Sequence, residues 1–192
     1  MAIRANHYEA AFEEYLRQRR IPYVAVDEQR RTLLEQASLK SMDFIVYSRN
    51  PVNLLVDIKG RRFPTVVGGH KWENWTGAED VPALLQWQEV FGTGFRAVVV
   101  FAYDLLEERH HADFPDRFEF RGRSYAFFGA WADDYQAAMN TRSASWKTVF
   151  VSGDKFEKMR FPMQSVLPLS PTTNAVATIP TAPEENLRVR TA

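Results

Sequence analysis

Apolar and polar residues follow one another along the chain at spacings that predict helices and strands in turn. Between positions 8 and 16, large apolar side chains recur every three or four residues, which predicts a helix with one buried face. Pro22 follows and ends this helix. Residues 80–91 form a second predicted helix, because Pro82 stands where a first helical turn tolerates proline and a glycine comes directly after the segment.

Four short runs of apolar and β-branched residues predict strands, at positions 23–26, 43–47, 53–59 and 95–103. The second and third runs are separated by Ser-Arg-Asn-Pro-Val, which is typical of a turn, so together they predict a β-hairpin. The last run is almost continuously apolar, as expected of a central strand covered on both faces. The resulting order of helix, three strands, helix and strand indicates an α/β fold.

The pattern is looser beyond position 104. Residues 118–128 predict a second hairpin around Arg-Gly-Arg, residues 131–139 a short helix and residues 147–151 another strand. We therefore expect residues 105–167 to form an α+β elaboration packed on the core. From position 168 the chain is rich in Pro, Thr, Ser and Ala, so residues 168–192 are expected to stay disordered because they cannot offset their ordering entropy.

Composition narrows the function classes. The chain has 192 residues and 45% hydrophobic positions, enough for one sizeable core. Because cysteine is absent, any metal must be held by oxygen or imidazole. No segment approaches the ~18 apolar residues of a membrane span, and the start of the chain has an amphipathic pattern, so we expect a cytoplasmic protein with no membrane partner. The net charge is zero, but arginines cluster locally.

The predicted hairpin carries the candidate chemistry. Asp43 opens its first strand, and Asp57 and Lys59 close its second. Because side chains alternate along a strand, Asp57 and Lys59 should share a face while Ile58 points into the core, and hairpin pairing can bring Asp43 beside Asp57. Two close carboxylates favour a hard divalent cation such as Mg²⁺, or Mn²⁺, and the lysine can assist a nucleophilic water. The competing interpretation is that these residues merely bound strands and cap a sheet edge.

These residues resemble the motif of the PD-(D/E)XK nuclease superfamily, and within it the archaeal Holliday-junction resolvases, over residues 8–103. The resemblance implies a restriction endonuclease-like core over residues 1–104, of order α-β-β-β-α-β, with a mixed central sheet flanked by helices. The chain departs from the usual pattern in Met42, which replaces a proline, and in Asp57, where glutamate is more common. The opening string His-Tyr-Glu-Ala-Ala-Phe-Glu also resembles the signature of the uncharacterised bacterial HYExAFE family.

The resemblance also assigns roles to residues on the two helices. It implies that Glu9 helps Asp43 and Asp57 to hold the metal, with Glu13, one turn on, as the alternative. A glutamine on the second helix steadies the site in many relatives, and here Gln88 or Gln86 would serve.

Two kinds of side chain could contact nucleic acid. Near the hairpin, four arginines could bind phosphates, although exposed arginines are often simply solvated: Arg30, Arg31, Arg61 and Arg62. Trp72 and Trp75 could stack on bases, but tryptophan is more often a packing residue. His110, His111 and Asp113 lack a further ligand at good spacing, which argues against a transition-metal site.

The sequence thus favours a Mg²⁺-dependent endonuclease that hydrolyses DNA phosphodiester bonds by a metal-activated water. Branched or damaged DNA is a candidate substrate and a homodimer a candidate assembly. The alternative is a catalytically inactive nuclease-fold protein that binds nucleic acid or another protein. A third hypothesis, an interaction module with no nucleic-acid role, predicts no salt-dependent binding to DNA.

Overall fold

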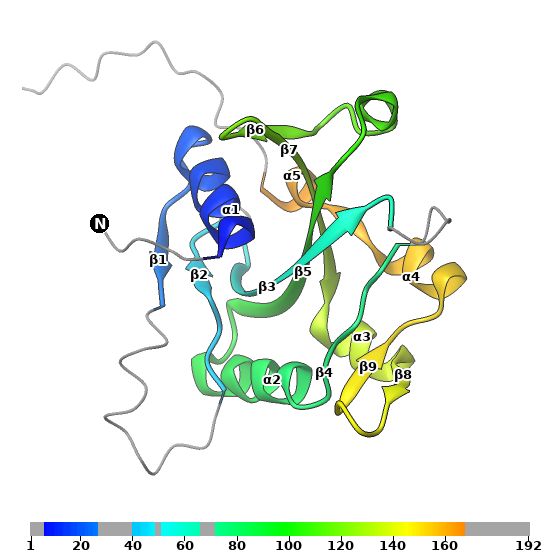
Figure 1. The fold of residues 1–192 in the computed structure, drawn as a ribbon. Helices are drawn as coiled ribbons and strands as arrows, with labels where there is room; N and C mark the ends of the chain where they lie inside the picture. The colour runs from blue at the N-terminus through cyan, green and yellow to red at the C-terminus, as the bar shows by residue number, and fades with distance from the viewer. Residues whose placement is uncertain (1–5, 27–39, 49–50, 66–71, 168–192) are drawn as a thin grey trace, which may run out of the picture.

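The computed structural model describes residues 6–26, 40–48, 51–65 and 72–167 as a mixed α/β fold (Figure 1). Its elements follow in this order: α1 His7–Gln18, β1 Tyr23–Ala25, β2 Phe44–Val46, β3 Asn53–Phe63, β4 Thr76–Gly77, α2 Asp80–Phe91, β5 Phe95–Leu105, η2 Glu108–Asp113, β6 Phe118–Phe120, β7 Arg123–Trp131, α3 Ala132–Ala138, β8 Asn140–Ser143, β9 Thr148–Phe150, α4 Gly153–Met159, β10 Phe161–Pro162 and α5 Met163–Val166. The predicted order of helix, three strands, helix and strand is confirmed up to β5, with β4 added.

One central sheet has the strand order β1-β2-β3-β5-β7-β10, and β6 pairs with β7 at its side. Strands β2 and β3 are antiparallel, with Phe44 opposite Val56, so the predicted hairpin is confirmed. Strand β3 runs parallel to β5, from Asn53 opposite Phe95 onward. Strand β5 is antiparallel to β7, which makes the sheet mixed, as expected, and joins the C-terminal half to it.

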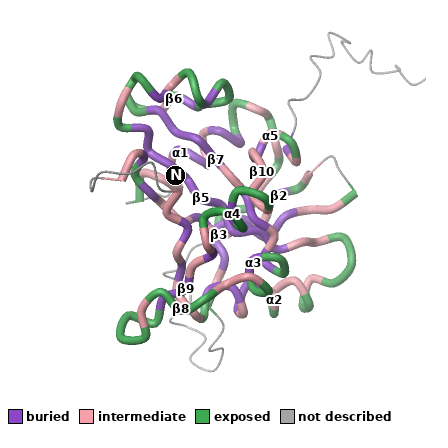
Figure 2. The backbone as a smooth tube through the Cα atoms, turned by 90° about the vertical axis from the view of Figure 1, so that its right-hand side faces the viewer, coloured by how far each residue is buried: buried purple, intermediate pink, exposed green. Residues whose placement is uncertain are grey.

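Helices cover both faces of this sheet. On one face, α1 packs through Phe12 and Leu16 against the side chains of Val56, Ile58 and their neighbours. On the other face, α2, α3 and α4 lie against a second cluster that includes Leu55 and Phe101. Figure 2 shows the buried positions concentrated in the central strands. Residues Ala97 to Tyr103 of β5 are fully buried, which confirms the prediction of a strand covered on both faces.

Several short elements were not anticipated. Strand β3 continues four residues past Lys59, to Phe63, and β4 and β8 join β9, which lies within the predicted strand at 147–151, in a small sheet of order β4-β9-β8. Two-residue strands such as β4 carry too few residues for a periodic pattern, because their pairing depends on a distant partner. Helix α4 and the 3-10 helix η2 were likewise missed.

Some predictions concern residues outside the described part of the chain, namely Arg30, Arg31 and the expected disorder of residues 168–192. Among the helices that the structure describes, none is long and apolar enough to cross a membrane. The cytoplasmic location stays a prediction.

Gly60 allows α1 to approach β3 closely. A Cβ atom placed on Gly60 would lie 2.1 Å from Cδ2 of the Tyr8 ring, a distance that real side chains do not adopt. We therefore expect Gly60→Ala to lower the free energy of unfolding by about 1–3 kcal/mol, as overpacked sites do. Urea unfolding measures this change.

Gly153→Ala is the matched control, because a Cβ at Gly153 meets nothing within 4 Å. Its stability should stay within about 0.5 kcal/mol of the wild type. Equal stabilities for the two variants would contradict the close approach of Tyr8 to β3.

Candidate functional site

The β2–β3 hairpin brings Asp43 to Asp57. Phe44 lies opposite Val56, and the backbone N–H of Asp43 donates a hydrogen bond of 2.9 Å to the carbonyl of Val56, the residue before Asp57. Asp43 is buried, and its Oδ2 accepts a hydrogen bond of 2.6 Å from the backbone N–H of Ile58. The carboxylate of Asp43 is therefore held against the strand segment that carries Asp57.

Lys59 shares the face of β3 that carries Asp57. Its Nζ lies 2.7 Å from Oδ2 of Asp57, while Ile58 between them is 5% exposed and packs against the opposite, α1-covered face. This arrangement follows from the alternation of side chains along a strand. The structure thus places Asp43, Asp57 and Lys59 together, as the sequence predicted.

Asp80, the first residue of α2, completes the cluster and was not predicted. Its Oδ2 lies 2.8 Å from Nζ of Lys59, and the same oxygen accepts hydrogen bonds of 2.7 Å from Oγ1 of Thr76 and 3.0 Å from N of Gly77. Oδ1 of Asp80 pairs with Lys40. We call Asp43, Asp57, Lys59 and Asp80 the carboxylate–lysine cluster. The sequence signal for Asp80 was an acidic residue in the first turn of the helix that follows the Asp-x-Lys strand.

Burial and nearby carboxylates shift the two hairpin carboxyls toward their neutral forms. Burial and the charges of Asp57 and Glu9 raise the pKa of Asp43 to about 7, although the N–H of Ile58 and the ammonium of Lys59 oppose the shift. Burial also raises the pKa of Asp57, against the pull of Lys59. A nearby divalent cation would favour the charged forms of both carboxyls and so oppose these shifts.

Lys59 and Asp80 are shifted toward their charged forms. Burial alone would lower the pKa of Lys59, but Asp57 and Asp80 outweigh it and raise this pKa above its usual value. Burial would likewise raise the pKa of Asp80, yet the charge of Lys59 and hydrogen bonds from Lys40, Lys59 and Thr76 hold it well below its usual value. The Lys59–Asp80 pair is therefore a permanent ion pair at neutral pH.

The donor set suits a hard cation held by few protein ligands. Asp43 and Asp57 offer only oxygen donors, and Mg²⁺ commonly binds one or two carboxylates and keeps several waters. In the part of the chain that the structure describes, no three His, Asp or Glu side chains surround a common point. The two hairpin aspartates could hold Mg²⁺ or Mn²⁺ with water completing the coordination.

Glu9 lies nearer the cluster than Glu13. The charge of Glu9 is among those that raise the pKa of Asp43, and its Oε1 accepts a hydrogen bond of 2.7 Å from Nδ2 of Asn6, the N-cap of α1. Glu13 instead accepts hydrogen bonds from Arg17, at 2.6 Å, and from the hydroxyl of Tyr23, at 2.8 Å. Of the two alternatives, Glu9 is the one whose charge acts on the site.

The two glutamines of α2 do not join the cluster. Oε1 of Gln88 accepts a hydrogen bond of 2.7 Å from the backbone N–H of Ala97 at the start of β5. Gln86 is exposed on the same helix. Asp80, at the start of the same helix, lies beside Lys59 instead, and the contact described for Gln88 is with β5.

The two arginines after Lys59 have opposite surroundings. Arg61 is 7% exposed, donates to the carbonyl of Trp75 and stacks on its ring, with the guanidinium 3.8 Å from the ring centroid. Burial lowers the pKa of Arg61 to about 10. Arg62 points to the other face and is exposed. Alternation along β3 therefore commits Arg61 to packing, contrary to its expected role in phosphate binding, and leaves Arg62 available.

The two tryptophans expected to be candidates for base stacking carry arginines on their rings. Arg61 lies over Trp75, and Arg160 lies 3.5 Å from the ring centroid of Trp72. These contacts favour packing over base stacking. His110 pairs with Asp113, its Nδ1 3.3 Å from Oδ2, and the described residues include no metal-ligating group there.

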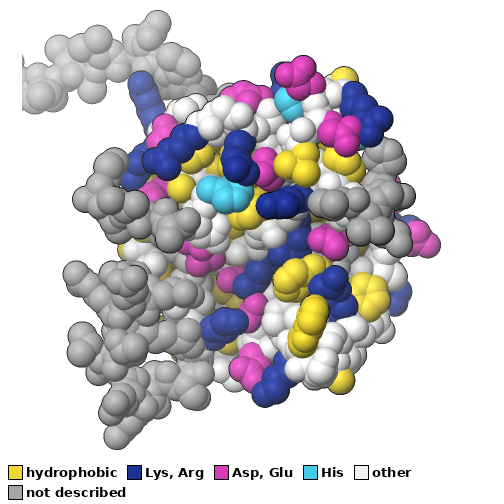
Figure 3. Space-filling model, in the orientation of Figure 1, with side chains coloured by type: hydrophobic (Ala, Val, Ile, Leu, Met, Phe, Trp, Pro, Cys, Tyr) yellow, Lys and Arg dark blue, Asp and Glu magenta, His cyan; other side chains and the backbone are white. Residues whose placement is uncertain are grey.

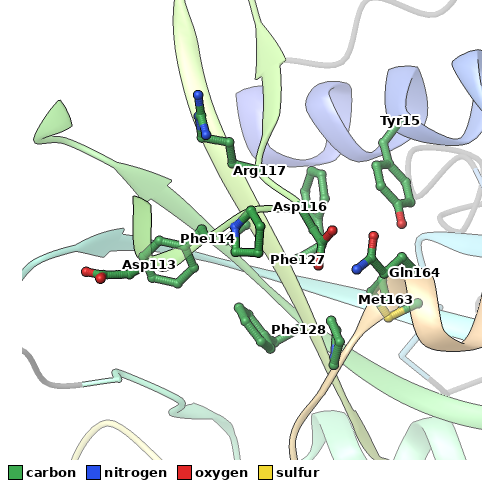
Figure 4. Close-up of a pocket in the computed structure, with 12 residues that line it drawn as sticks. Tyr15, Asp113, Phe114, Asp116, Arg117, Phe127, Phe128, Met163 and Gln164 are labelled. Atoms are coloured by element: carbon green, nitrogen blue, oxygen red, sulfur yellow. The ribbon is translucent and has the colours of Figure 1, made fainter. Parts of the chain in front are cut away.

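A cavity lies apart from the carboxylate–lysine cluster. A cavity of about 140 Å³ lies between Tyr15 of α1, Phe127 of β7 and Met163 of α5, with Asp116 and Gln164 at its rim (Figure 4). No member of the carboxylate–lysine cluster lines it.

Comparisons with known proteins identify the fold only distantly. No family model matches the chain, so the resemblance to the HYExAFE family has no support, and no curated protein matches either. Among solved structures, the chain is similar to Archaeoglobus fulgidus Hjc, a Holliday junction resolvase from an archaeal hyperthermophile. That similarity has a TM-score of 0.47 and 11% sequence identity, and it covers 83% of this chain and 92% of that one.

The raised pKa of Asp43 predicts how stability depends on pH without metal. The folded pKa, about 7, exceeds the ordinary value of 3.8, so the folded state binds the extra proton. Its stabilising effect is complete below pH ~4 and is lost as pH rises through about 7. Asp43→Asn keeps an acceptor for Ile58 and removes the charge. The variant should match the wild type at pH 4 and exceed it by a few kcal/mol at pH 8.5, because one pKa unit corresponds to about 1.4 kcal/mol.

Urea unfolding in a chelating buffer at both pH values measures the difference. Glu79→Gln, which removes an exposed carboxylate, should leave the pH dependence of the wild type unchanged. Parallel pH profiles for the wild type and Asp43→Asn would show that Asp43 does not carry this proton.

Proposed function

We propose that this protein is a metal-dependent endonuclease that hydrolyses DNA phosphodiester bonds, with Mg²⁺ or Mn²⁺ as its cofactor. The observation that carries the proposal is the meeting of the buried carboxylate of Asp43 and the half-buried carboxylate of Asp57 beside the ammonium of Lys59. A phosphodiester is itself an anion and would be repelled by such a pair. A divalent cation between the carboxylates removes this repulsion and gives the phosphate a place to bind.

Each side chain of the site has a distinct task in this proposal. Asp43 and Asp57 would hold Mg²⁺, which when bound would supply Lewis acidity toward the phosphate and the attacking water. Lys59 donates hydrogen bonds to the oxygen on which negative charge develops. Glu9 adds an acidic group that orients water at the mouth of the site. The backbone N–H of Ile58 fixes the orientation of the Asp43 carboxylate.

A basic surface beside α1 supports DNA as the substrate. His7, Arg62 and Arg123 come from α1, β3 and β7. Burial lowers the pKa of His7, and the charges of Arg123 and Arg62 lower it further. Figure 3 shows Lys and Arg side chains beside a histidine on the face where α1 lies. His7 and Glu9 share the first turn of α1. Arg62 of this surface is exposed, so it could contact a phosphate group.

One observation favours the rival function, a nuclease fold that binds nucleic acid without cutting it. Lys59 already pairs with Asp57 and Asp80, so part of the negative charge is neutralised with no cation present. This rival shares the basic surface and differs in cleavage alone. A cleavage assay therefore separates the two functions.

Cleavage should depend on metal, on Asp57 and on Lys59. With Mg²⁺ or Mn²⁺, the wild type should cut plasmid, branched or single-stranded DNA, and a chelator should stop the reaction. Asp57→Asn and Lys59→Met should each lower kcat by about 10²-fold or more, because each removes charge that acts in the transition state. Rates from gel-resolved products measure this effect.

Asp133→Asn, an exposed acidic change on α3, serves as the control and should cut at the wild-type rate. Cleavage that persists in both site variants would remove the site assignment. Salt-dependent binding without any cleavage would establish the rival.

Arg62 should contribute to DNA affinity through phosphate contact. In metal-free buffer, Arg62→Gln should weaken DNA binding and reduce the slope of log K against log salt by about one, as expected for one lost phosphate contact. Arg96→Gln is the control and removes the same charge. Arg96 lies near the start of β5, whereas Arg62 lies beside its end, so this variant should leave the slope unchanged. Equal slopes in all three proteins, measured by fluorescence anisotropy, would place the DNA on another face.

A further inference from the structure

Asp80 is the connecting member of the carboxylate–lysine cluster. It comes from the first turn of α2, whereas Asp57 and Lys59 come from β3. One of its oxygens contacts Lys59, Thr76 and the N–H of Gly77, and the other pairs with Lys40. A single buried carboxylate thus joins the helix, the β4 segment and the strand that bears the lysine.

The surroundings of Asp80 fix its carboxylate in place. Its side chain is 6% exposed. A Cβ atom on Gly77 would lie 2.8 Å from Oδ1 of Asp80, so the glycine admits the carboxylate at this distance. The start of a helix also favours a negative side chain, because the helix dipole is positive there. The position of the carboxylate is therefore set by its neighbours before any substrate arrives.

We propose that Asp80 is a positioning residue, which holds the ammonium of Lys59 at the site and keeps Asp57 available to a divalent cation. This inference rests on the proposed function. Nζ of Lys59 lies 2.7 Å from Asp57 and 2.8 Å from Asp80, so the two carboxylates share one ammonium. With Asp80 present, Lys59 keeps an anionic partner when the cation takes Asp57. Without it, Lys59 pairs with Asp57 alone and competes with the cation.

Asp80→Asn separates charge from shape. The amide oxygen still accepts from Thr76 and Gly77, so the start of α2 is preserved, while the anion that holds Lys59 is lost. We expect kcat of DNA cleavage to fall about 10- to 100-fold, the loss that follows when a catalytic group is misplaced by about 1 Å. KM for DNA should be unchanged. Mn²⁺ binding, measured by calorimetry without DNA, should weaken several-fold and remain detectable.

Glu79→Gln is the matched control, since it removes an exposed carboxylate from the neighbouring position. It should retain the kcat, KM and Mn²⁺ affinity of the wild type. Wild-type kcat in Asp80→Asn would overturn the proposal. So would a loss of Mn²⁺ binding as complete as in Asp57→Asn, because Asp80 would then be a ligand.

Gly77→Ala provides a second variant in case Asp80→Asn does not fold. It leaves every charge in place and displaces the Asp80 carboxylate, so kcat should fall without loss of Mn²⁺ binding. An unchanged kcat in Gly77→Ala would count against the positioning role.

A further readout keeps this inference distinct from the proposed function. If the wild type cuts no DNA, the nuclease proposal fails, and the ¹⁵N resonance of the Lys59 ammonium then tests Asp80 by itself. That resonance should move in Asp80→Asn and stay in place in Glu79→Gln. An unmoved resonance in Asp80→Asn would overturn the positioning role whatever the activity.

Discussion

One ammonium group shared by two carboxylates organises the site. Lys59 is largely buried, and a buried ammonium is stable only when it is paired and hydrogen-bonded. Asp57, two residues earlier on β3, supplies one partner and Asp80 on α2 the other. Because the second partner comes from another element, the pairing also fixes where α2 begins relative to the sheet.

The same pairing divides the charge of Lys59 between Asp57 and Asp80. The cluster holds three carboxylates, and Lys59 is the cation that lies among them, with Lys40 reaching only the outer oxygen of Asp80. The charge of Lys59 and hydrogen bonds from Lys40, Lys59 and Thr76 lower the pKa of Asp80, whereas burial and the charge of Asp57 raise the pKa of Asp43. A divalent cation at Asp43 and Asp57 would stabilise the charged forms of these two carboxyls.

Local patterning predicted the part of the site that lies within one hairpin. Asp43, Asp57 and Lys59 could be placed together because strand alternation and antiparallel pairing act over a few residues. Asp80 lies 21 positions after Lys59, and its contact depends on how α2 packs, which no periodicity encodes. For Arg61 the prediction was wrong although a local signal was present. Alternation puts Arg61 on the same face as Lys59, where it packs on Trp75, yet its charge suggested an exposed role.

A net charge of zero therefore says little about how this protein would meet a polyanion. The guanidinium of Arg61 packs on Trp75, and the ammonium of Lys59 pairs with Asp57 and Asp80. Arg62, one residue beyond Arg61, faces outward, and it reaches the surface beside His7. The alternation of β3 thus sends Arg61 inward, where it packs on Trp75, and Arg62 to the opposite face, where a phosphate backbone could lie across it.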